Sequence, residues 1–126
     1  MNEFRPFRRN LTIDPFVIPI SMTPTPMHIG KSVLDAKGVT SFKISNPNPF
    51  WVWYRGWNGN QAQMPTIEGM GHFIAPGATE INSSQIPDWI AAMPSDEPGF
   101  PIFDANGAYL YEGKRTRLVM LYGGGS

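Results

Sequence analysis

The sequence contains no cysteine, and this absence excludes disulfide bonds, thiolate metal sites and cysteine nucleophiles. Charge is scarce as well, because charged residues make up only 16% of the 126 residues, compared with roughly 25% in typical soluble domains. The ten basic and ten acidic residues cancel, so no net field would attract nucleic acid or an anionic membrane. We therefore expect neither of these as a partner.

Long apolar runs are missing too. No run in the sequence would suffice for a transmembrane helix or for the core of a signal peptide. The first ten residues carry three arginines, but no such run follows them. We expect the protein to be made and used in the cytosol, or to be carried in a particle that is assembled there.

The sequence also lacks a recognisable catalytic pattern. The two histidines, His28 and His72, lie in no motif that pairs a serine nucleophile with its base. Asp96 and Glu97 lie in a proline-rich stretch that would not hold them as a rigid catalytic pair. The residues after Asp104 do not supply the later ligands of a calcium loop. The sequence predicts no enzymatic activity, no metal site and no cofactor.

Glycine and proline, in contrast, are abundant, with 13 of each. They interrupt long helices and favour short strands joined by turns. Hydrophobic residues make up 41% of the chain, which is enough for one core at this length. The composition therefore predicts a single all-β domain.

Residues 1–30 are predicted to form an extended N-terminal arm, because five prolines restrict this segment. The stretch from Ile13 to Ile20 is nevertheless apolar, unlike a solvated linker. There are two interpretations. The arm lies against its own domain, a neighbouring subunit or another protein, or it forms an edge strand of the domain itself.

Residues 31–122 are predicted to form the β-sandwich domain, and residues 123–126 a flexible tail. Short apolar stretches between turn residues indicate the strands. The final stretch, 117–122, is apolar on both faces, which favours a buried central strand. The other expected strands are 32–34 and 39–45, joined as a hairpin, and then 50–55, 66–76 and 79–82.

One short helix is expected after Ser84, which can cap it, with Pro87 in the first turn and Pro94 at its end. An acidic loop is expected over residues 94–106. Asn106-Gly107 predicts a type I′ turn between two short strands, because this dipeptide adopts the positive φ angles that such a turn requires.

The most informative segment is the aromatic stretch from Phe50 to Trp57. Successive side chains of a strand point to opposite faces, so Phe50, Val52 and Tyr54 would line the core. Trp51, Trp53 and Arg55 would lie on the other face, and tryptophan and arginine are enriched at the centres of protein interfaces. An exposed tryptophan pair could equally stack on sugar rings, or a second sheet or the arm could cover it.

The sequence resembles the small cement, or decoration, proteins of tailed bacteriophage capsids. Three segments carry the resemblance: FKISNPNPFWV at 42–52, GHFIAPG at 71–77 and SQIPDW at 84–89. The resemblance implies a jelly-roll or related β-sandwich that forms homodimers or homotrimers. It also implies a protein that binds the major capsid protein on the outside of the shell, after assembly in the host cytoplasm.

The hypothesis from the sequence is therefore a non-enzymatic virion protein that decorates the capsid and stabilises it by bridging capsid subunits. Arg5, Arg8 and Arg9 could pair with an acidic capsid surface, and a terminal arm could add a strand to a neighbouring sheet edge. The alternatives are a carbohydrate-binding module and a tail or neck component. The candidate partner-binding residues are Arg5, Arg8, Arg9, Phe16, Val17, Ile18, Trp51, Trp53, Arg55 and Trp57.

Overall fold

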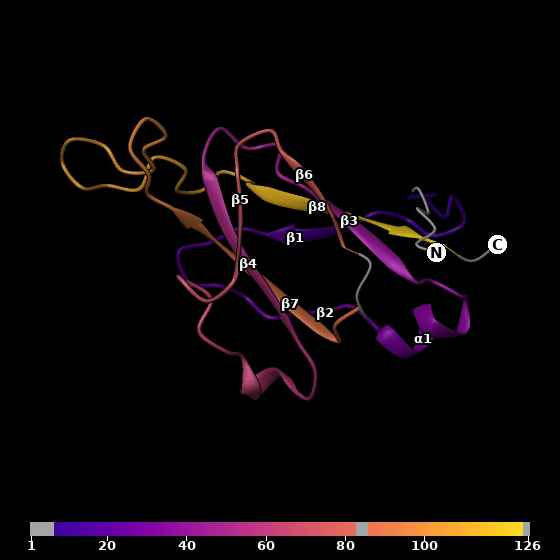
Figure 1. Ribbon diagram of the computed structural model, residues 1–126. Helices are drawn as coiled ribbons and strands as arrows, with labels where there is room; N and C mark the ends of the chain where they lie inside the picture. Colours follow the sequence, from indigo (N-terminus) through magenta and orange to yellow (C-terminus); the bar gives the residue numbers. More distant parts are fainter. Residues whose placement is uncertain (1–6, 83–85, 125–126) are drawn as a thin grey trace.

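The computed structural model describes residues 7–82 and 86–124, and in these ranges eight strands form two four-stranded sheets (Figure 1). All strand pairs within the sheets are antiparallel. The first sheet has the order β1 (Phe16–Pro19), β8 (Arg117–Gly123), β3 (Ser41–Ser45) and β6 (Thr79–Asn82). The second has the order β2 (Met27–His28), β7 (Trp89–Ser95), β4 (Trp51–Trp57) and β5 (His72–Ile74).

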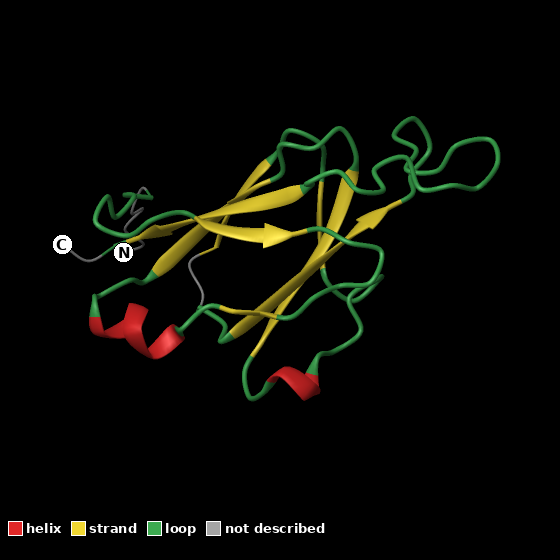
Figure 2. Cartoon of the chain, turned by 180° about the vertical axis from the view of Figure 1, so that it is seen from behind, coloured by secondary structure: helices red, strands yellow, loops and turns green. Residues whose placement is uncertain are grey.

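The chain changes sheet at every connection between consecutive strands except the one from β4 to β5. This alternation gives the strand order of a jelly roll, in which two antiparallel sheets pack face to face. Figure 2 shows the two layers, with the helical segments outside them. The all-β sandwich expected from the sequence is confirmed.

The hydrophobic core lies between the sheets and follows the two-residue period of the strands. In β4, for example, Val52 and Tyr54 are buried, while Trp51, Trp53 and Arg55 are half-buried on the other side. Both sheets contribute fully buried apolar side chains to one cluster, including Ile18, Ile44, Ile74, Ile90, Leu118 and Met120.

A buried asparagine joins the two sheets at one end of the core. Asn46 follows β3, and its side-chain amide lies 2.9–3.2 Å from the carbonyl oxygens of Phe50, Ile74 and Ala75. Its side-chain oxygen accepts hydrogen bonds from the backbone and side-chain amides of Asn48. One polar side chain thus bonds backbone groups of the β3–β4 connection, of the end of β5 and of the β5–β6 connection, and buried backbone groups require such partners.

The first part of the predicted hairpin is wrong, because residues Lys31–Ala36 form helix α1. Gly38 has a φ of 77° and its N–H bonds to the carbonyl of Asp35, while the N–H of Val39 bonds to that of Leu34. These two bonds form a Schellman motif, which ends helices at a left-handed glycine. Gly38, which lies where the hairpin turn was expected, is therefore a helix terminator.

The helix predicted after Ser84 is also wrong. Ser84 itself lies outside the described residues, but Trp89–Ser95 form strand β7 and pair along their whole length with β4. Pro94 is tolerated because it lies beyond Trp89 and Ile90, the two residues that pair with β2. The short helical segments of the described chain are instead α1 and the 3-10 turn η1 (Gln61–Gln63).

The N-terminal segment is part of the sandwich. β1 is an edge strand of the first sheet and pairs with β8, and β2 is an edge strand of the second sheet. Of the two interpretations of this segment, the structure therefore agrees with the one in which it forms an edge strand of the domain. Gly30, at the end of the segment, is the N-cap of helix α1. At the other end of the chain Gly123 belongs to β8, and the N–H of Gly124 donates to the carbonyl of Arg8.

β8 is a central strand of its sheet, as expected, although only one of its faces is buried. Leu118, Met120 and Tyr122 are in the core, whereas Val119 and Leu121 are half-buried on the outer face.

The turn at Asn106-Gly107 is not type I′. Within the described chain only glycines have positive φ angles, so Gly107, with a φ of 80°, has one and Asn106 does not. A type I′ turn requires a positive φ at both central residues. The carboxylate of Asp104 accepts hydrogen bonds from the N–H groups of Asn106 and Ala108. This side-chain bonding stabilises a different turn.

We expect Asn46→Ala to lower the free energy of unfolding by roughly 2 kcal/mol or more, because it leaves buried carbonyl groups without a donor. Urea denaturation measures this difference. Asn106→Ala is the matched control at an exposed asparagine, and it should change stability by less than about 0.5 kcal/mol. Equal effects of the two substitutions would contradict the role given to Asn46.

Burial raises the pKa of Tyr122 to about 12. Because the unfolded chain releases this proton first, near pH 10, the contribution to stability is complete below that pH and is lost as pH rises toward 12. The unfolding free energy falls as the pH rises from 10 to 12, and Tyr122→Phe should make this fall less steep. The change in slope should correspond to the release of up to about one proton on unfolding. Denaturation at a series of pH values measures the slope, and an unchanged slope would contradict this assignment.

Candidate binding surface

All four tryptophans of the chain point outward from the second sheet, on the side away from the core. The strand register places Trp53 between Phe73 of β5 and Met93 of β7, and it pairs Trp57 with Trp89. We call this surface the tryptophan face. It consists of His28, Trp51, Trp53, Arg55, Trp57, Phe73, Trp89 and Met93.

Three rings of the tryptophan face form one stack. The ring of Phe73 lies 4.3 Å from that of Trp51 and 4.2 Å from that of Trp53, with an angle of 23° between the planes in both pairs. Trp51 and Trp53 are two positions apart on β4, and Phe73 on the neighbouring strand fits between them. The stack holds two half-exposed tryptophans in place and covers one ring surface of each.

The other end of the tryptophan face is connected to a loop. The indole N–H of Trp57 donates to the carbonyl of Asn60, and that of Trp89 donates to the carbonyl of Gly59. The ring of His28 lies 4.7 Å from that of Trp89. The polar atoms of both indoles are thus satisfied internally, and their apolar ring surfaces remain at the surface of the sheet.

Arg55 is the only charged residue that β4 contributes to this face. One guanidinium nitrogen donates to the carbonyl of Thr66 at 3.0 Å, which is its only hydrogen bond within the described residues. The guanidinium group therefore keeps most of its donors for a partner. A cation within an apolar aromatic surface is a common arrangement at the centre of protein interfaces.

The structure does not bring all the predicted binding residues together. Trp51, Trp53, Arg55 and Trp57 share the tryptophan face, whereas Phe16, Val17 and Ile18 belong to β1 of the first sheet. Arg8 and Arg9 are exposed beside the end of β8, Val17 is exposed on the outer face of the first sheet, Phe16 is half-buried, and Arg5 lies outside the described residues.

Ile18 was predicted to contact a partner, and this prediction is wrong because its side chain is fully buried in the core. The strand that was expected to extend a neighbour's sheet instead pairs with β8 of its own chain.

Sequence reasoning missed four members of the tryptophan face: His28, Phe73, Trp89 and Met93. The signal was present, because Trp89, Ala91 and Met93 alternate with Ile90 and Ala92 as a two-residue period requires. The helix predicted across this segment concealed it.

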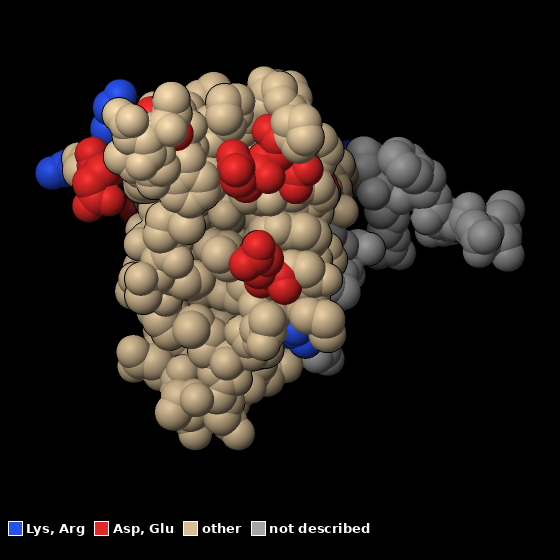
Figure 3. Space-filling view, turned by 90° about the vertical axis from the view of Figure 1, so that its left-hand side faces the viewer, with Lys and Arg blue, Asp and Glu red and all other residues tan. Residues whose placement is uncertain are grey.

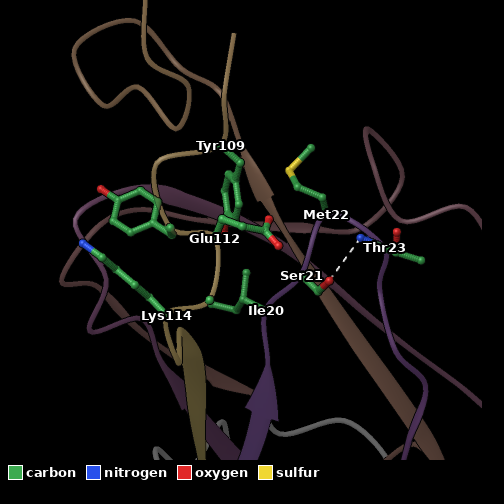
Figure 4. Close-up of a pocket in the computed structure, with 9 residues that line it drawn as sticks. Ile20, Ser21, Met22, Thr23, Tyr109, Glu112 and Lys114 are labelled. Atoms are coloured by element: carbon green, nitrogen blue, oxygen red, sulfur yellow. Dashed lines mark hydrogen bonds between the residues drawn. The ribbon is translucent and has the colours of Figure 1, made fainter. Parts of the chain in front are cut away.

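The structure also has a cavity of about 280 Å³ near the loops that follow β7 (Figure 4). Segment Ile20–Thr23 lines one side, and Tyr109, Tyr111 and residues 112–114 line the other. Burial raises the pKa of Tyr109. Its hydroxyl oxygen is buried and has no hydrogen-bond partner among the described residues, while the Thr116 hydroxyl donates to the carbonyl of Ile20. These side chains do not form a nucleophile and base pair.

Charges are sparse over much of the molecular surface. Seen from the side on which the loops after β7 protrude, most of the surface is uncharged; acidic side chains lie in the upper and middle parts of the view, and basic ones lie beside them at the upper left (Figure 3). In the described residues no three histidine or acidic side chains are placed to hold a metal ion. No helix in the same ranges is long and apolar enough to cross a membrane.

Comparison with protein families, with curated proteins and with solved structures gives no match for this chain. The tryptophan face is therefore interpreted from its own geometry.

We expect Phe73→Leu to loosen the aromatic stack while keeping an apolar side chain on β5. Each aromatic pair contributes about 0.5–1.5 kcal/mol beyond burial, so the loss of two pairs should lower stability by about 1–3 kcal/mol. Tryptophan fluorescence should also become more accessible to acrylamide. Phe100→Leu is the control at an exposed phenylalanine, which has no ring contact with any residue that the structure describes. Unchanged quenching in the first variant would contradict the stack.

Proposed function

We propose that the protein is a non-enzymatic structural protein of a virion, which decorates the capsid exterior and stabilises the shell by bridging neighbouring major capsid proteins. The tryptophan face is the principal docking surface in this proposal. The observation that carries it is the placement of all four tryptophans, with Arg55 among them, on the outer side of one sheet.

The chemistry of this face supports a protein partner. Aromatic residues and arginine contribute most to binding when an interface covers them and excludes water. The stack around Phe73 already holds Trp51 and Trp53 in place, which lowers the entropy lost on docking. The low charge of the chain further suits a surface that an assembly covers.

A bridging protein needs a second surface, and the opposite sheet offers one. Its outer side carries exposed apolar residues, of which Val17 and Ile81 are the most accessible. The two candidate surfaces therefore lie on opposite sides of the sandwich. This arrangement suits a protein that contacts two neighbours at once.

Carbohydrate binding is the second candidate, and one observation favours it. The exposed loop next to Trp57 and Trp89 carries the amide side chains of Asn58, Asn60, Gln61 and Gln63, and aromatic rings beside amides are suited to sugars. However, Phe73 covers one ring surface of both Trp51 and Trp53. Sugar binding would thus be restricted to one end of the face.

Binding of the purified protein to undecorated capsids tests the proposal. We expect saturable binding and a higher melting temperature of the shell. Trp53→Ser should weaken binding by about 30-fold or more, as expected for loss of a central interface residue. Arg55→Ala tests the same face without removing a ring from the stack, and Phe100→Ser is the control outside it.

Absence of saturable binding would overturn the proposal, as would equal affinity of Trp53→Ser and the native protein. Labelling of whole virions distinguishes the shell from a tail or neck location. Binding to a glycan array that Trp57→Ala abolishes would instead favour the carbohydrate alternative.

A further inference from the structure

The cavity beside the loops after β7 lies between two separate stretches of the chain (Figure 4). Segment Ile20–Thr23, which follows β1, lines one side, and residues from the range 109–114 line the other. Its volume of about 280 Å³ is far more than the roughly 30 Å³ that one water molecule occupies, and drug-sized ligands need about 300 Å³ or more. The cavity therefore has the size for one amino-acid side chain or a comparably small molecule.

Both walls of the cavity are held in place by the fold. The N–H of Ile20 donates to the carbonyl of Thr116, and the Thr116 hydroxyl donates to the carbonyl of Ile20. On the other wall the ring of Tyr111 lies 4.6 Å from that of Phe50, a fully buried core residue. The ring of Tyr109 in turn makes an edge contact with that of Tyr111. Because the walls are anchored on the core, little ordering is needed when a ligand binds.

Polar side chains in the cavity lack partners of their own. The Glu112 carboxylate makes no hydrogen bond or ion pair within residues 7–82 and 86–124, and the same is true of the Thr23 hydroxyl. The hydroxyl oxygen of Ser21 accepts one hydrogen bond, from the N–H of Thr23. In Figure 4 the Glu112 side chain points from its loop toward Ser21 and Thr23. One negative charge and two hydroxyl groups therefore adjoin the same space.

Lys114 is the basic residue that lines the cavity, but it does not neutralise this carboxylate. Its side chain extends away from the wall that Ile20 belongs to (Figure 4), and its ammonium nitrogen lies 5.8 Å from the centre of the Tyr111 ring. Arg115, the next residue, is exposed and does not line the cavity. Of the described residues that line the cavity, Glu112 is thus the one whose charge is directed between the two walls.

We propose that this cavity binds an alkylammonium group, either the side chain of a lysine in a partner protein or a free primary amine. A positive charge is complementary to the Glu112 carboxylate, and the hydroxyl oxygens of Ser21 and Thr23 can accept hydrogen bonds from an ammonium group. The tyrosine rings and Met22, which is 40% exposed, provide apolar contacts for the alkyl chain. Glu112 would repel an anion, and a neutral ligand would forgo the attraction between opposite charges.

This inference goes beyond the proposed function and does not rest on it. The cavity shares no residue with the tryptophan face, and its test does not involve capsids.

An NMR titration of the isotope-labelled full chain tests the site. The probe is N-acetyl-lysine methylamide, in which the side-chain ammonium is the only charge. We expect saturable shifts of the amide signals of residues 21–23 and 109–114, with a dissociation constant in the millimolar range, as suits a single small ligand. N-acetyl-norleucine methylamide has the same chain without the ammonium group, and it should bind at least about threefold more weakly.

Two substitutions that preserve side-chain size test the charges of the site. Glu112→Gln should weaken binding of the lysine probe at least about threefold, because it removes the carboxylate charge. Lys114→Met should strengthen binding by up to about threefold, because it removes a nearby positive charge that repels the ligand. Glu68→Gln is the matched control at an exposed glutamate that does not line the cavity, and it should leave the affinity unchanged.

Butylammonium chloride distinguishes the two sources of the ligand. Tighter binding of the capped lysine supports a protein side chain as the occupant, and tighter binding of butylammonium supports a free amine.

Four results would overturn the inference. The first is the absence of saturable shifts at the cavity up to about 50 mM of the lysine probe, well above a millimolar dissociation constant. The second is equal affinity for the lysine and norleucine probes, and the third is unchanged affinity in Glu112→Gln. The fourth is loss of binding in Lys114→Met, which would instead indicate a ligand with a negative group.

Discussion

The pairing of β4 with β7 is the interaction on which most of this structure depends. Seven residues of each strand face one another in register, from Trp51 opposite Ser95 to Trp57 opposite Trp89. Since side chains alternate between the faces of a strand, this one register decides which residues enter the core. A shift by one residue would bring Val52 and Tyr54 to the surface and bury Trp51 and Trp53.

The same register explains why the chain has an aromatic surface at all. Trp51 and Trp53 occupy outward positions because Val52 and Tyr54 are needed for the core, and Phe73 on β5 is placed between the two tryptophans. A sandwich with so few charged residues has to place apolar side chains on its surface. Here they gather on the outer sides of both sheets, as Trp53 does on the second sheet and Val17 and Ile81 on the first.

Particular elements show how far the sequence could be interpreted. The strands at 41–45, 51–57 and 117–123 follow from short apolar stretches between turn signals, which predict their type. For 51–57 the alternation also predicts the inward residues Val52 and Tyr54, whereas 117–122 was expected to be buried on both faces and is buried on one. The segments at Lys31–Ala36 and Trp89–Ser95 were assigned the wrong structure. In each, glycine, proline or a capping residue had a local preference that was compatible with two structures, and contacts distant in sequence selected one of them.

The sequence by itself determined that the chain forms an all-β domain with one core, because its glycine and proline content excludes long helices and its length allows a single hydrophobic cluster. It also determined the aromatic strand and the side of that strand on which Trp51, Trp53 and Arg55 lie. Only the tertiary structure decided that Phe73, Trp89 and Met93 join them, and that Ile18 is buried instead of available to a partner. The physical reason is that strand neighbours are chosen by hydrogen bonds and packing between segments far apart in the chain, which no local pattern specifies.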